Sequence, residues 1–170
     1  MVWDALLYRD PATNEYLPNL ATSYNWVDSK TLEFDLRKGV TFHNGEKFDA
    51  DDVVYTLTYI SNPENGAKPA RNVNWWDSAE KLGDYKVRLN LTKEFPAALE
   101  FLSGPIVMYP NEYYAEVGPE GMAMKPVGTG PYAVTSVEPG KRYKFKKNNN
   151  YHASSPVSYT HLRAHETLRY

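Results

Sequence analysis

The sequence contains no cysteine, which excludes disulfide bonds and thiolate chemistry but does not decide the cellular compartment. It has no run of about 18 apolar residues, so we expect no membrane-spanning segment. It shows no secretory signal peptide, that is, no positively charged start followed by an apolar stretch and a small-residue cleavage site. Taken alone, this favours a cytoplasmic protein. The formal net charge is −2 and no basic stripe is visible, so we expect no nucleic-acid partner.

The 170 residues are enough for one domain with a substantial core, and aromatic residues make up 14% of them. The chain holds 14 tyrosines and 4 tryptophans. These side chains combine an apolar face with a polar group, which suits both cores and ligand pockets. Packing in the core is the simpler interpretation for most of them.

The most structured stretch of the sequence runs from Leu36 to Ile60. Asn44-Gly45 supplies the two positive-φ positions of a tight hairpin turn, and His43 beside it fits a hydrogen-bonded turn residue. Asp49 is typical of a helix N-cap, and Asp52 stands where a side chain reaches back to that cap. Capping therefore accounts for these carboxylates without acid–base chemistry. Apolar residues at helical spacing follow, namely Val53, Val54, Leu57 and Ile60.

Alternating apolar and polar residues predict strands elsewhere in the chain, at 32–36, 85–91, 132–137 and 142–147. Short helices are expected over 97–102 and 111–117, the second followed by a loop at 118–121. Pro139-Gly140 predicts a type II turn. The fold class is therefore α+β, with more strand than helix.

Two motifs carry a resemblance to a known family. LRKGVTFHNGEKFDADDVVYTL resembles the signature of the extracytoplasmic solute-binding proteins of ABC transporters, family 5, the peptide, nickel and opine group. Pro126-Val127-Gly128-Thr129-Gly130-Pro131-Tyr132 resembles the downstream motif of the same family. The similarity runs from about Val2 to about Tyr151. Members are much longer, so the resemblance implies a fragment.

The resemblance implies part of a two-lobed fold like that of type II periplasmic binding proteins, a mixed sheet with flanking helices. Residues 1–126 would form the small subdomain of the first lobe, and 127–156 the first strands of its larger, hinge-side subdomain. The implied function is the substrate-binding component of an ABC importer, which binds a solute between its lobes without chemistry. The implied partners are a small solute, with peptide favoured, and a membrane-embedded permease. The resemblance also implies a monomer without a cofactor. It implies export to the periplasm or the extracellular side, directed by a leader upstream of this sequence.

The last residues, VSYTHLRAHETLRY at 157–170, match nothing in the family pattern and resemble a translated cloning tail. His161 and His165 are four residues apart and Glu166 follows, a spacing that can chelate zinc on a helix. A small metal-dependent hydrolase built on these residues is the least favoured alternative, and we expect no metal site.

The candidate binding residues lie in three places. Gly128, Thr129, Gly130 and Tyr132 form a segment where glycines permit close approach of a ligand or of another part of the chain, so a pocket wall and a crossover between lobes are both open. By the resemblance, Tyr109 ends a loop that faces the cleft. Trp75 and Trp76 suit a pocket wall or a sugar platform, although packing is simpler. A free-standing glycan-binding module is therefore a further alternative.

Overall fold

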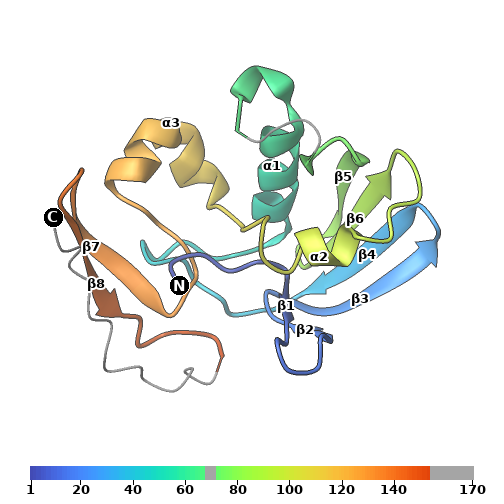
Figure 1. Cartoon of the computed structure of the whole chain (residues 1–170), viewed down its shortest axis with the longest axis horizontal. Helices are drawn as coiled ribbons and strands as arrows, with labels where there is room; N and C mark the ends of the chain where they lie inside the picture. Colours follow the sequence, from blue (N-terminus) through green and yellow to red (C-terminus); the bar gives the residue numbers. More distant parts are fainter. Residues whose placement is uncertain (68–71, 154–170) are drawn as a thin grey trace, which may run out of the picture.

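The computed structural model describes residues 1–67 and 72–153, which form three antiparallel sheets and a set of helices (Figure 1). β1 (Leu7–Arg9) pairs with β2 (Tyr16–Pro18). The four-stranded sheet has the order β3-β4-β6-β5, and β7 pairs with β8. The four strands are β3 (Ala21–Asp28), β4 (Thr31–Leu36), β5 (Trp76–Gly83) and β6 (Lys86–Leu91).

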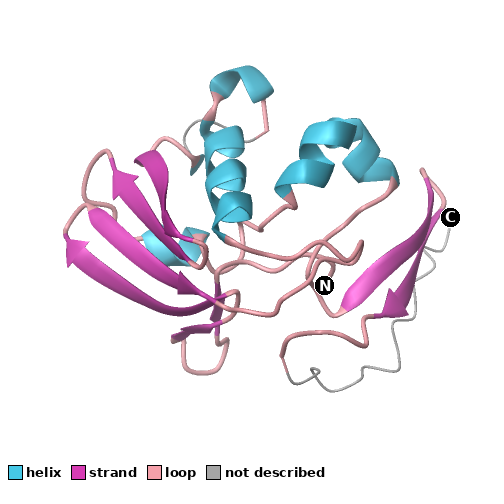
Figure 2. Ribbon diagram, turned by 180° about the vertical axis from the view of Figure 1, so that it is seen from behind, coloured by secondary structure: helices cyan, strands magenta, loops and turns pink. Residues whose placement is uncertain are grey.

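The four-stranded sheet is built from the predicted alternation. Leu32, Phe34 and Leu36 of β4 and Val87, Leu89 and Leu91 of β6 are buried on one face. The opposite face carries Glu33 of β4 between Lys86 and Arg88 of β6, at 2.9 and 2.6 Å. Helix α1 (Ala50–Ser61) covers the apolar face (Figure 2). The strands predicted at 32–36 and 85–91 are thereby confirmed.

The hairpin before α1 differs from the predicted two-residue turn. Gly45 has φ 95°, but Asn44 does not have a positive φ. The Phe42 N–H donates to Glu46 O at 2.8 Å, and the Gly45 N–H donates to Phe42 O at 2.9 Å. This is a three-residue loop with glycine at its left-handed position, which needs only one positive φ. The prediction for Asn44 was therefore wrong.

Helix α1 begins as predicted. The Asp51 N–H donates to Asp49 Oδ1 at 2.8 Å, and the Asp49 N–H donates to Asp52 Oδ2 at 2.9 Å, which completes a capping box. Val53, Leu57 and Ile60 of this helix are buried, whereas Val54 is half-buried. The helix is followed by a short 3₁₀ turn, η1 (Pro63–Asn65).

The later helices differ from expectation in length. α2 spans Ala98–Phe101, and α3 spans Asn111–Met124. The loop predicted at 118–121 is a kink inside α3, where Gly118 has φ 65° and Pro119 follows. Gly118 takes up a positive-φ extended conformation with ψ −173°, which glycine tolerates, and proline then fits the start of the next helical stretch. Gly118 is non-helical and separates two helical stretches, so the predicted end of the first helix at 117 is confirmed, whereas the residues after Gly118 form a second helical stretch where a loop was predicted.

β7 (Tyr132–Glu138) and β8 (Arg142–Lys147) form a separate two-stranded sheet beyond the N-terminal segment (Figure 1). Gly140 has φ 72° and the Lys141 N–H donates to Glu138 O at 3.0 Å, which fits the predicted type II turn. The resemblance implied a mixed sheet, whereas the strand pairings within the described residues are antiparallel. No helix among the described residues is long and apolar enough to cross a membrane. The predicted tail at 157–170 lies outside the described residues.

Candidate functional site

The segment 126–132 crosses the molecule beside the first three residues of the chain. The Gly130 N–H donates to Val2 O at 2.9 Å, and the Tyr132 N–H donates to Met1 O at 3.1 Å. The indole Nε1–H of Trp3 donates to Val127 O at 2.9 Å. The N–H groups of Gly130 and Tyr132 and the carbonyl of Val127 are therefore already bonded to residues 1–3.

The two glycines are required by this close approach. A Cβ on Gly128 would lie 2.2 Å from Val2 O and 2.7 Å from Trp3 Cδ1. A Cβ on Gly130 would lie 2.5 Å from Met1 O. The close contact predicted at these glycines exists, and residues 1–3 make it.

Thr129, between the glycines, is buried against an acidic side chain. Its Oγ1 donates to Asp4 Oδ2 at 3.1 Å, and His152 Nε2 lies 3.1 Å from the same oxygen. The Tyr151 hydroxyl lies 3.4 Å from Asp4 Oδ1. Burial first, and then the Asp4 carboxylate, raise the pKa of Tyr151 to about 12. Asp4 therefore joins the crossover to the residues that follow β8.

An open groove lies beside this cluster. It has a volume of about 620 Å³ and is bordered by the N-terminal segment, by β2, by the loop after α2 and by the end of the crossover. Its walls include Tyr8, Asn19, Ser103, Val107, Pro131 and Tyr151. Hydroxyl and amide groups alternate with apolar surface here, a composition that suits a small polar solute.

An apolar cavity of about 530 Å³ lies on the other side of Trp3, between α3 and the β7–β8 ribbon. Its walls include Trp3, Tyr109, Tyr114, Met122, Val134 and Phe145. The rings of Trp3 and Tyr109 meet edge to face at 6.1 Å. Burial raises the pKa of Tyr109. The predicted site residue Tyr109 therefore lines this apolar cavity. Trp3, which was not predicted, lines both the apolar cavity and the groove.

Helix α1 sets the position of the segment that carries Tyr109. The Tyr109 N–H donates to Thr56 Oγ1 at 3.1 Å, and the Asn111 N–H donates to Asp52 Oδ1 at 2.9 Å. Burial of Asp52 raises the pKa of its carboxyl group to about 7, although the two N–H groups that it accepts oppose the shift. Asp52, whose side chain completes the capping box of α1, thus also fixes the start of α3.

Trp75 and Trp76 lie at the start of β5 and belong to the core. They are 1% and 4% exposed, and their rings meet edge to face at 4.6 Å. Trp75 also stacks on Phe95 at 4.8 Å. A sugar platform needs an exposed ring face, which neither residue has, so the packing interpretation accounts for both. They are not part of the groove or of the apolar cavity.

Residues that sequence reasoning missed are Trp3, Asp4 and His152. They come together with Thr129 and Val127 across separations of more than 120 positions, and no local pattern marks them. Within residues 1–67 and 72–153, no group of three or more His, Asp or Glu side chains is arranged to hold a metal ion. His161, His165 and Glu166 lie outside the described residues.

An open groove lined by apolar side chains and a few polar groups is the kind of surface on which proteins bind small ligands. The family model of bacterial extracellular solute-binding proteins, family 5 Middle, matches residues 15–165. The chain belongs to this family, as its two motifs predicted.

The relatives are consistent with this assignment. The chain is 29% identical to di/tripeptide-binding protein 1 of Pseudomonas aeruginosa (strain UCBPP-PA14), over 95% of this chain and 34% of that protein. It is similar to the structure of NikZ from Campylobacter jejuni in complex with Ni(L-His), with a TM-score of 0.81, 30% identity, and coverage of 91% of this chain and 31% of that one. For DppA from Helicobacter pylori in complex with the peptide STSA, the TM-score is 0.78 at 26% identity, over 90% and 34%. The chain spans about a third of the length of the curated relatives that it matches.

Proposed function

We propose that the chain is part of the substrate-binding component of an ABC importer for peptides or related solutes. The observation that carries this proposal is the family match over residues 15–165. Relatives include proteins named for binding di- and tripeptides. Members of the family are binding proteins, and we infer that this chain likewise holds its solute without converting it.

We infer that the solute contacts the groove beside the crossover. The groove is lined by Tyr8, Ser103 and Asn19. Ser103 Oγ already donates to Glu100 O and Asn19 Nδ2 to Ala5 O, both at 3.0 Å, so these two side chains would present their oxygen atoms to the solute as acceptors. The buried segment Gly128, Thr129 and Gly130 would then support one wall, and Pro131 would touch the solute. Tyr132 and Tyr109 would act behind that wall.

We infer a division at the crossover, with residues 1–126 as one subdomain and 127–156 as the first strands of another. The separate β7–β8 sheet supports this division. A second lobe, supplied by a longer chain, would close over the groove and stabilise the closed population. We further propose that the protein binds its solute in the periplasm or outside the cell. It would act as a monomer and deliver the solute to a permease.

The proposal is tested by titrating the chain with di- and tripeptides while recording amide NMR signals. One lobe provides only part of the contacts, so we expect weak binding, with a dissociation constant of about 1 mM or above. The shifts should map to Ser103, Val107 and Tyr151. Ser103→Trp, which fills the groove, should abolish them, whereas Thr135→Trp on the exposed side of β7 should not.

Two results would count against the proposal. Shifts confined to other surfaces would remove the groove as the solute site. An affinity of about 1 µM for the chain alone would show that no second lobe is needed.

A further inference from the structure

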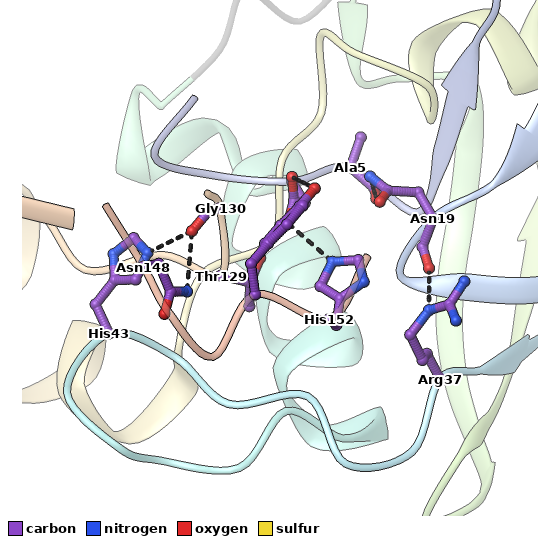
Figure 3. Close-up of polar contacts among 10 residues, drawn as sticks. Ala5, Asn19, Arg37, His43, Thr129, Gly130, Asn148 and His152 are labelled. Atoms are coloured by element: carbon purple, nitrogen blue, oxygen red, sulfur yellow. Dashed lines mark hydrogen bonds and ion pairs between the residues drawn. The ribbon is translucent and has the colours of Figure 1, made fainter. Parts of the chain in front are cut away.

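His43 joins the hairpin turn at 42–45 to the crossover by three hydrogen bonds. Its backbone N–H donates to Gly128 O at 2.9 Å. Its ring Nε2 lies 2.8 Å from Gly130 O, and the Gly128 N–H lies 3.3 Å from its ring Nδ1. Figure 3 shows the imidazole directed at Gly130, whose carbonyl also accepts from Asn148 Nδ2 at 3.1 Å. One side chain thus holds two backbone positions of the crossover.

These contacts require one protonation state of the ring. The Gly128 N–H is a donor, so Nδ1 must be unprotonated and accept. The Gly130 carbonyl is an acceptor, so Nε2 must carry the hydrogen. The neutral Nε2–H tautomer satisfies both contacts. A doubly protonated imidazolium would place an Nδ1–H against the Gly128 N–H and lose that bond.

We propose that His43 is the positioning residue that holds the crossover at Gly128–Gly130 in place, and that its ring releases the Gly128 N–H when it takes up a second proton. The link is separate from the contacts that residues 1–3 make with the same segment. It therefore couples the hairpin before α1 to the segment that leads into β7.

The surroundings of the ring favour its neutral form. Burial lowers the pKa of His43 below its ordinary 6.5, although the hydrogen bond to Gly130 O opposes this shift. The charged groups that act on the ring are Asp4 of the N-terminal segment, which raises the pKa, and Lys146 of β8, which lowers it. The Asp4 carboxylate is already shared among the donors Thr129, Tyr151 and His152. We therefore expect release below pH 6.5.

Release of the Gly128 N–H would affect both cavities through the residues next to it. Val127, the preceding residue, holds the indole of Trp3. Trp3 lines the groove and the apolar cavity, and Pro131 at the end of the crossover lines the groove. That a change here alters solute binding rests on the proposed function, whereas the role of His43 in positioning the crossover does not.

The first test reads the tautomer directly. Imidazole ¹⁵N shifts of the full chain should show an unprotonated Nδ1 and a protonated Nε2 for His43 at pH 8. The amide signals of Gly128 and Gly130 should then titrate with the His43 ring, with a midpoint below 6.5. An Nδ1–H tautomer, or glycine signals that do not follow the ring, would overturn the proposal. This measurement needs neither a variant nor a solute, so it stands apart from the peptide titration.

The second test uses a matched pair of variants. Gln carries an NH2 donor group and a carbonyl acceptor but does not ionise, so His43→Gln should fold and lose the titration at Gly128 and Gly130. His152→Gln removes a neighbouring imidazole, and the titration should persist. If the glycine signals still titrate in His43→Gln, or cease to titrate in His152→Gln, then another group controls them and the proposal fails.

Discussion

Substitution of Gly128 by alanine measures how closely the chain packs on its own crossover. The added Cβ would lie 2.2 Å from Val2 O, far inside the 3.0 Å below which such contacts essentially never occur. The obstacle is backbone, so residues 1–3 must move away. Overpacking of this kind costs about 1–3 kcal/mol, and weakening the bonds of Gly130 to Val2 and of Trp3 to Val127 adds about 1 kcal/mol each. We expect a loss of about 3–5 kcal/mol in the free energy of unfolding.

Urea unfolding followed by circular dichroism measures this loss, with Gly104→Ala as the control. With a slope of about 2 kcal/mol per molar urea, the midpoint of Gly128→Ala should fall by about 1.5–2.5 M. Gly104 is exposed, has no atom within 4 Å of its built Cβ and lacks a positive φ, so its alanine variant should gain about 0.5 kcal/mol. If Gly128→Ala loses less than about 1 kcal/mol, the close approach is not a constraint on the fold and the reasoning is refuted.

Two further predictions concern buried side chains. The folded pKa of Asp52, about 7, lies above its ordinary 3.8, so the stability that it contributes is fully present below pH 3.8 and is lost as the pH rises through about 7. In Asp52→Asn, the free energy of unfolding should therefore change less with pH between pH 4 and 8 than in the unsubstituted chain. If it changes with pH as much as before, another group is responsible for the pH dependence. Trp75→Ala should cost about 4 kcal/mol in urea unfolding because the ring is buried, whereas Val27→Ala, at a 52% exposed residue, should stay within about 0.5 kcal/mol. Equal losses for the two would show that Trp75 is not a core residue.

Features set by neighbouring residues were predictable from the sequence. The capping box of α1 depends on Asp49 and Asp52, three positions apart, and the turn at Gly140 depends on adjacent proline and glycine. The burial of β4 and β6 follows from alternation of period two. The predicted turn at Asn44-Gly45 failed in detail because a three-residue loop satisfies the same residues with one positive φ.

The candidate site was predictable only in part. The motif at 126–132 indicated where glycines permit close approach, but not what approaches them. For Trp75 and Trp76 the sequence favoured packing but left a pocket wall or sugar platform open, and the structure decides for packing because the rings of Phe95 and Phe101 lie against Trp75.

The sequence by itself determined the family, the α+β class and the local elements, because these depend on residue types at short and regular spacing. Only the tertiary structure decided that residues 1–3 pack against the crossover and that His43 bonds to both Gly128 and Gly130. It also decided that Thr129 and His152 both bond to Asp4. The physical reason is that these contacts join positions 85 to 148 residues apart. Their donors and acceptors meet only after the sheets and helices have packed, and no spacing along the chain encodes the meeting.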